Sequence, residues 1–187
     1  MYKIYELLPD SYKAIIRKII TPLIYMIPAK IWSSWIWKRK FGEKLNLQNP
    51  VTYNERLQWL KVYGERRPDV FGDVTLAKKC SDKLGVREYV AATIGEQYLN
   101  PLLGIYDRLE DIPFTEFPGQ FVIKSTHDSG SVVIVTDKNN IPKERLQFIK
   151  YRLGVNYGRL QKEWVYKDII PKIIVEKLIS ADYKDTL

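Results

Sequence analysis

The sequence predicts an α+β fold, because helical and extended patterns occupy separate parts of the chain instead of alternating regularly. Helical patterns dominate the first half, and short β-branched runs follow later. The 187 residues are 45% hydrophobic and 13% aromatic, which supplies a buried core and excludes a disordered chain. With one cysteine, Cys80, and one histidine, His127, an intramolecular disulfide and a Cys/His zinc site are also excluded.

The N-terminal residues 1–41 are predicted to form a basic, tryptophan-rich amphipathic helical segment, followed by a domain at residues 42–187. Acidic residues and prolines interrupt the apolar runs of this segment, so we expect neither a signal peptide nor a single spanning helix. Lysines and arginines surround Trp32, Trp35 and Trp37, a mixture typical of helices that lie among lipid headgroups. The alternative is that these tryptophans pack onto the domain and the lysines form its solvated rim.

A capping box is predicted after a turn-rich connector at residues 42–50. Thr52 and Glu55 have the spacing at which each side chain bonds the other residue's backbone amide. The helix that they begin is expected to end at Gly64. Its inward side chains are expected to be Leu57, Trp59 and Leu60.

The remaining elements follow from periodicity. Residues 76–94 have helical spacing, with the polar triplet 81–83 suited to a helix start and Gly95 marking the stop. An acidic, proline-rich loop separates the first extended run from the next two, which form a hairpin. The extended runs lie at residues 99–106, 121–125, 131–135 and 173–179, and a helix begins at Pro142.

The hairpin carries the first sign of chemistry. Lys124 interrupts an apolar strand, where a lysine either points to water or serves an anionic ligand. Ser129, Gly130 and Ser131 follow, and such small residues let backbone N–H groups converge on a phosphate. The alternative is an ordinary hairpin with an exposed lysine. The chain has no Walker A loop and no GxGxxG motif.

The last extended run contains the second sign, because Glu176 and Lys177 interrupt it. An edge strand would explain both charges, since edge strands use charge to prevent association. The functional alternative is a strand end whose backbone pairs with a nucleotide base while apolar side chains pack on the base.

Four segments together resemble the TupA-like ATP-grasp family over residues 40–179. They are KFGEKLNLQNPVTYNERLQWLKVY, SDKLGVREYVAATIGEQYLNPLLGIYD, FVIKSTHDSGS and KEWVYKDIIPKIIVEKLI. Genes for this family are often found with those for capsule, teichuronopeptide or other surface polymers, and many members carry a loose glycosyltransferase label. The resemblance implies ATP bound between two sheets, with a carboxylate activated as an acyl phosphate and then attacked by an amine.

The resemblance also implies a nucleotide site. Lys83 and Lys124 would neutralise the α and β phosphates, residues 129–131 would cover them, and residues 176–178 would border the adenine. The cofactor-binding residues implied by position are Lys83, Lys124, His127, Ser129, Gly130, Ser131, Glu176, Lys177 and Leu178.

Two features depart from the family pattern. Asp128 stands where members commonly have glycine, and its carboxylate would repel a phosphate unless it turns outward. In the family the chain continues into a DYKF-like strand and then to acidic residues that bind magnesium. The tripeptide Asp182-Tyr183-Lys184 resembles the DYKF-like strand only superficially. We therefore expect a partial ATP-grasp fold, a helical N-terminal region plus the first nucleotide-binding subdomain. It would lack the C-terminal metal-binding half, and the chain alone would be inactive.

The function predicted from the sequence is ATP-dependent ligation of a carboxylate and an amine by the complete form, in surface-polysaccharide or teichuronopeptide biosynthesis. The residues do not specify either substrate. The alternatives are a non-catalytic nucleotide- or partner-binding module at the membrane surface and a glycosyltransferase, although no DxD metal motif supports the latter. The net charge of +8 is spread along the chain without a nucleic-acid-binding motif, so nucleic acid is not an expected partner. A single unpaired cysteine fits the cytoplasm, with membrane contact expected at its inner face through residues 11–40.

Overall fold

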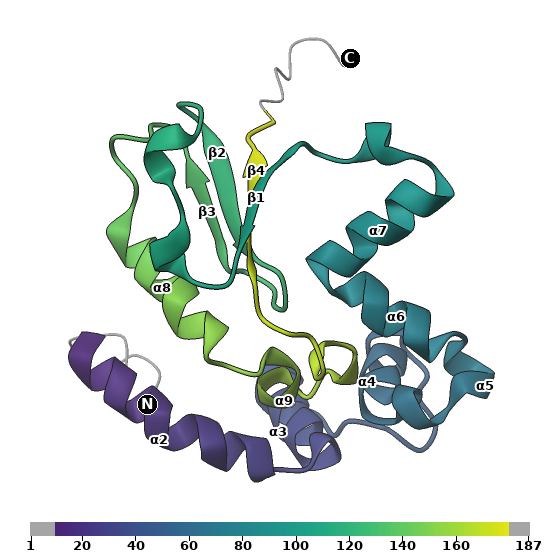
Figure 1. Ribbon diagram of the computed structural model, residues 1–187. Helices are drawn as coiled ribbons and strands as arrows, with labels where there is room; N and C mark the ends of the chain where they lie inside the picture. Colours follow the sequence, from purple (N-terminus) through teal and green to yellow (C-terminus); the bar gives the residue numbers. More distant parts are fainter. Residues whose placement is uncertain (1–9, 180–187) are drawn as a thin grey trace, which may run out of the picture. The chain divides into compact units, whose positions relative to one another are not determined.

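The computed structural model describes residues 10–179, with side chains from residue 18 onward (Figure 1). The chain divides into two compact units. The first comprises the residues up to Gly72 together with Gly158–Trp164, and the second comprises Asp73–Tyr157 and the residues from Val165 onward. The last two acidic residues of the sequence, Asp182 and Asp185, lie outside the described residues.

The first unit is helical. Its elements are α2 (Asp10–Met26), α3 (Ala29–Phe41), α4 (Tyr53–Tyr63), η1 (Gly64–Arg66), α5 (Pro68–Phe71) and most of α9 (Tyr157–Gln161). The helices α2 and α3 are bent by 112° at a break that contains Pro28. Within residues 10–179 no single helix has the length and apolarity to cross a membrane, although this bent pair taken together does.

A small core fixes the orientation of α4. The predicted capping box is present, since the Thr52 hydroxyl accepts from the Glu55 amide and the Glu55 carboxylate accepts from the Thr52 amide. Trp59 packs against the buried residues of α3 and the connector, namely Trp37, Leu45 and Leu47. The prediction for Leu57 was wrong: this side chain is 43% exposed, because it lies across the helix from Trp59.

The tryptophans of α3 divide between core and solvent. Trp37 is 5% exposed, as the packing alternative predicted, whereas Trp35 is 52% exposed. The guanidinium of Arg39 lies over the Trp35 ring, 5.6 Å from its centre. One face of this helix is therefore structural, and another presents an aromatic ring and a cation to the solvent.

The second unit is built on a four-stranded antiparallel sheet in the order β1-β4-β2-β3. The strands are β1 (Leu102–Tyr106), β2 (Phe121–Ser125), β3 (Val132–Val135) and β4 (Ile173–Lys177). The α+β class and the β2–β3 hairpin are confirmed. The edge-strand interpretation of β4 was wrong, because β4 lies between β1 and β2 with neighbours on both sides.

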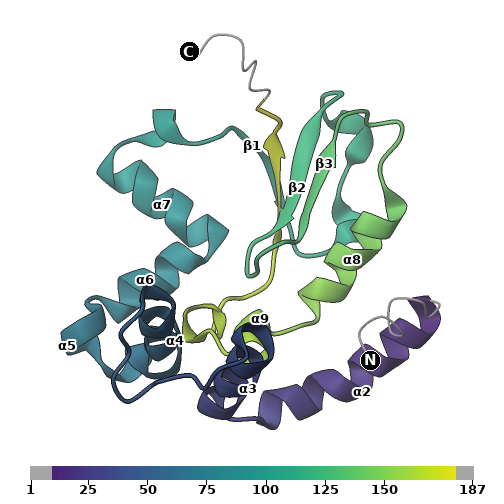
Figure 2. The same cartoon turned by 180° about the vertical axis from the view of Figure 1, so that it is seen from behind.

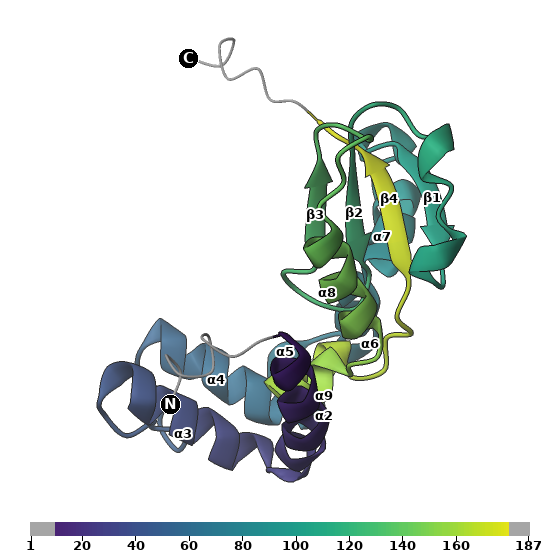
Figure 3. The same cartoon turned by 90° about the vertical axis from the view of Figure 1, so that its left-hand side faces the viewer.

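The helices of this unit lie on opposite sides of the sheet, α8 (Lys143–Leu153) on one side and α7 (Lys83–Thr93) on the other, as Figures 2 and 3 show. The helical pattern at residues 76–94 forms two helices, α6 (Val74–Ser81) and α7, because the backbone of Asp82 is extended. The Asp82 carboxylate accepts from the Leu84 amide, so it caps α7 as the polar triplet predicted. Short 3-10 turns complete the chain: η2 (Glu96–Tyr98), η3 (Leu109–Asp111), η4 (Phe114–Glu116) and η5 (Trp164–Tyr166).

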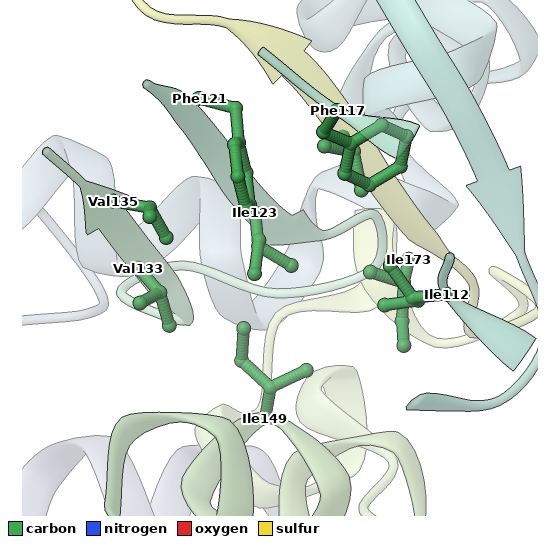
Figure 4. Close-up of a cluster of buried hydrophobic side chains, with 9 residues drawn as sticks. Ile112, Phe117, Phe121, Ile123, Val133, Val135, Ile149 and Ile173 are labelled. Atoms are coloured by element: carbon green, nitrogen blue, oxygen red, sulfur yellow. The ribbon is translucent and has the colours of Figure 1, made fainter. Parts of the chain in front are cut away.

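The main hydrophobic core lies between the sheet and α8 (Figure 4). Strand alternation sends Phe121, Ile123 and Val175 to this face, and Ile149 of α8 fills the space opposite them. The acidic loop before β2 contributes Ile112 and Phe117 to the same core. One face of the sheet is thus sealed, which leaves the opposite face for charged groups and ligands.

Candidate functional site

The candidate site lies on the face of the sheet opposite to α8. In the register between β2 and β4, Val122 is paired with Glu176 and Lys124 with Ile174, so Lys124 and Glu176 are on one face, diagonally placed on adjacent strands. The ammonium of Lys124 is 2.5 Å from one carboxylate oxygen of Glu176. Lys124 thus neither stands free in water nor lies unpaired in an apolar strand.

Glu176 is held from a second direction by α7. Arg87 donates to the other carboxylate oxygen of Glu176 over 2.8 Å, and its second terminal nitrogen donates to the Asn100 carbonyl. The carboxylate is buried, with a side-chain exposure of 7%. A buried carboxylate requires such partners, and here each oxygen has a cation of its own.

Lys83, the first residue of α7, joins the helix to the loop after β2. Its backbone amide donates to the Thr126 carbonyl, and its ammonium is 2.5 Å from the Asp128 carbonyl oxygen. Burial lowers the pKa of Lys83, the positive charge of Lys124 lowers it further, and Asp128 opposes both. Lys83 and Lys124 therefore belong to one electrostatic site.

We call Lys83, Arg87 and Lys124 the cationic cluster. Three carboxylates act on it: Glu176, Asp82 and Asp128. Asp128 is already paired with Arg152, so four cations face three carboxylates. The net positive charge leaves the site suited to an anion.

The loop between β2 and β3 is held by a buried carboxylate. Asp128 accepts hydrogen bonds from the hydroxyls of Ser125 and Ser131, and Arg152 of α8 donates to it over 2.6 Å. Burial alone would raise the pKa of Asp128, but these three hydrogen bonds together outweigh burial and lower it. From the sequence, Asp128 was expected either to repel a phosphate or to turn outward, and the structure shows neither: the carboxylate turns inward, where Arg152 neutralises it.

Two of the residues predicted for phosphate contact have buried side chains. The Nε2 atom of His127 lies within hydrogen-bond distance of the Arg152 and Val155 carbonyls, so Nε2 carries a proton and donates it to them. Burial is the main cause of the lowered pKa of His127. The Ser131 hydroxyl is committed to Asp128. These two side chains shape the loop from within.

The tip of the loop is exposed. Ser129 and Gly130 are both exposed, and Gly130 has a φ of +93°, in the left-handed region that favours glycine. The small residues singled out in the sequence therefore divide into an exposed tip, Ser129-Gly130, and a buried anchor, Ser131.

Lys177 and Leu178 follow Glu176 at the end of β4, and the register pairs Lys177 with Phe121, so the Lys177 side chain is on the α8 face of the sheet. Lys177 is exposed, but its amide donates to the Pro101 carbonyl and its carbonyl accepts from the Asn100 side chain. Leu178 is half-buried. Lys177 was predicted to border the adenine, but its backbone amide and carbonyl are already hydrogen-bonded within the chain.

Apolar side chains flank the charges on the same face. Ile105 is paired with Ile174, Leu102 with Glu176, and Ile134 with Val122, and all three of these flanking residues are exposed. A partly exposed apolar surface next to a net positive charge suits a ligand with a flat apolar part and an anionic part.

Arg87 and Arg152 were missed in the sequence. Arg87 follows Lys83 by four residues, which places both on one side of a helix, and this spacing could have identified it. Arg152 carries no such signal, because its partner Asp128 lies 24 residues earlier in another element. Among residues 10–179 no group of three or more His, Cys, Asp or Glu side chains gathers as a metal site would require.

A family model described as TupA-like ATPgrasp matches residues 55–186, more than half of the chain. This range includes the cationic cluster, the β2–β3 loop and β4. No curated protein and no solved structure matches.

Proposed function

Because the chain belongs to the TupA-like ATP-grasp family, we propose that its second unit binds ATP on the face of the sheet opposite to α8 and serves an ATP-dependent ligase. The observation that carries this proposal is the net positive charge of the cationic cluster beside an exposed apolar surface. Polyphosphates need fixed cations, and a base needs an apolar surface.

The described residues suggest how the triphosphate is held. Lys83 and Lys124 supply the charges, and the exposed tip at Ser129 and Gly130 supplies backbone N–H groups. When Lys124 turns to a phosphate, Arg87 stays bonded to Glu176, so the buried carboxylate keeps a cationic partner. Without a ligand, the ion pair with Glu176 holds the Lys124 ammonium in the site. The base is proposed to lie against β4, next to Leu178.

We propose further that the activity is the joining of a carboxylate to an amine in the synthesis of a cell-surface polymer. A carboxylate oxygen attacks the γ phosphorus of ATP, giving an acyl phosphate and ADP, and the amine then displaces phosphate and loses a proton. The family binds magnesium as well as ATP. Among the described residues, no group of three or more His, Cys, Asp or Glu side chains gathers that would hold it.

The nucleotide proposal is tested by the thermal unfolding of the full chain with and without ATP. A ligand at 100 times its dissociation constant stabilises the folded state by about 2.7 kcal/mol. We expect Lys124→Gln to remove most of the ATP-induced rise in midpoint. The variant also loses the pair with Glu176, so its unliganded midpoint falls, and the quantity compared is the shift that ATP produces.

Lys150→Gln is the matched control, since Lys150 of α8 forms an exposed ion pair with Glu110 on the other side of the sheet. It should keep the full ATP shift. An equal shift in both variants would place ATP away from Lys124.

A second proposal concerns the first unit, whose helices α2 and α3 we propose to contact the inner face of the membrane. The observation that favours it is a group of exposed apolar side chains among basic ones: Ile19, Leu23, Met26, Ile31 and Trp35. Interfacial helices combine these residue types. Ile31→Ser with Trp35→Ser should abolish sedimentation with anionic vesicles, whereas unchanged sedimentation would contradict the proposal.

A further inference from the structure

A pocket of about 540 Å³ lies in the first unit, between α3, the connector that follows it and the end of α4. Three lysines line it, and no carboxylate does. The complete lining is Lys30, Ser34, Lys38, Lys44, Leu45, Asn46, Leu47, Gln48 and Tyr63. None of these residues belongs to the proposed ATP site.

One wall of the pocket is a row on α3. Lys30, Ser34 and Lys38 are spaced by four residues, which places them along one side of the helix. This side is next to the one that buries Ser33 and Trp37 in the small core. The row is therefore carried by a helix that packing holds in place.

The opposite wall is the connector, which alternates between core and pocket. Leu45 and Leu47 are buried beside Trp37, whereas Lys44, Asn46 and Gln48 are exposed. The Asn46 side chain accepts from the amides of Gln48 and Asn49, which fixes the local turn. Two buried leucines thus hold polar side chains on the pocket side.

The charge of the pocket is uncompensated within the part of the chain that the structure describes. No ion pair joins Lys30, Lys38 or Lys44 to a carboxylate among those residues. Three lysines that line one pocket without a carboxylate give it a positive potential, which favours the entry of an anion. The hydroxyls of Ser34 and Tyr63 and the amide of Gln48 add neutral donors.

We propose that this pocket binds the phosphate group of a phosphate ester. Phosphate is the anion that takes several cationic and neutral donors together, and the volume leaves room for the group attached to it. The ester is either the headgroup of an anionic lipid or a soluble phosphate ester. The proposal is independent of ATP binding by the second unit.

The test is NMR of the full chain, titrated with inorganic phosphate against chloride at equal ionic strength. Phosphate should give saturable shifts of the Ser34, Asn46 and Gln48 amides. The triple variant K30Q/K38Q/K44Q should weaken this binding by about tenfold or more. The charge-retaining variant K30R/K38R/K44R should retain it, which separates a lost site from a lost fold.

The control R66Q/K143Q/K167Q removes the same charge from exposed positions elsewhere and should bind phosphate normally. Equal affinity in K30Q/K38Q/K44Q and this control, or shifts that chloride reproduces, would overturn the proposal. The source of the phosphate is read from sedimentation with phosphatidylcholine vesicles that contain phosphatidylglycerol. Sedimentation of the unmodified chain that inorganic phosphate lowers, relative to chloride at equal ionic strength, identifies a lipid headgroup. Sedimentation that phosphate leaves unchanged, with saturable phosphate binding by the unmodified chain, identifies a soluble ester.

Discussion

Lys124 and Glu176 form an ion pair across the neighbouring strands β2 and β4, with the ammonium 2.5 Å from the carboxylate. Both residues interrupt apolar strands, and each charge compensates the other. Because Arg87 holds the second oxygen of the same carboxylate, Lys124 can exchange its partner for a ligand without leaving a buried charge alone.

Arg87→Gln should lower the free energy of unfolding of the second unit by about 2–4 kcal/mol, because it removes one cation from a buried carboxylate. Urea denaturation measures the change. Lys150→Gln breaks an exposed ion pair with Glu110 in the same unit and should cost far less. Equal losses for the two variants would show that the Glu176 carboxylate is solvated.

Asp128→Asn should destabilise the second unit by about 3–5 kcal/mol, because Arg152 and Asp128 are a buried pair and the variant leaves the guanidinium uncompensated. It should not strengthen ATP binding, since the carboxylate points away from the exposed tip of the loop. Calorimetric titration with ATP checks the second point. Tighter ATP binding at unchanged stability would mean that Asp128 faces the ligand.

The stability of the second unit should depend on pH through His127. Burial lowers the pKa of His127 in the folded state, so the unfolded chain takes up the proton first as the pH falls. The contribution of the neutral imidazole is complete above the unfolded pKa of about 6.5 and is lost as the pH falls toward and through the folded pKa. Urea midpoints should therefore decrease as the pH falls from about 7.5 to about 5.

His127→Gln should flatten this dependence whatever its effect on stability at neutral pH, because the chain has no other histidine. The measured quantity is the slope of the midpoint against pH. A slope identical to that of the unmodified chain would assign the effect to another group.

Gly130→Ala should destabilise the β2–β3 loop by about 1 kcal/mol, because alanine is strained at a φ of +93°. An added Cβ meets no atom of another part of the chain within 4 Å, so the cost comes from the backbone conformation of residue 130 itself. Gly119→Ala is the matched control: it is equally open but has no positive φ, and it should be neutral or slightly stabilising. Thermal unfolding of both variants measures the difference.

Local patterns predicted the elements whose signals are contained within a few residues. The capping box at Thr52, the β2–β3 hairpin and the cap at Asp82 each depend on neighbours in the sequence. Lys124 and Glu176 were identifiable because a charge in an apolar strand needs a partner.

Long-range pairing could not be predicted in the same way. The central position of β4 depends on strands that lie far from it in sequence, and the inward turn of Asp128 depends on Arg152 of α8. Leu57 was misassigned because the pattern of α4 does not reveal which side the core of the first unit occupies.

The position of β4 between β1 and β2 has a consequence for the order of folding. Until residues 173–177 are available, β1 has no neighbour in the sheet and the β2–β3 hairpin stands alone. An isolated hairpin is marginally stable in water, so during synthesis both β1 and the hairpin wait for a segment made much later. Closing the sheet over such separations makes its formation slow relative to that of the helices. In that interval the unpaired sides of β1 and β2 are open to other chains, and chaperones would be expected to engage the nascent protein at this stage.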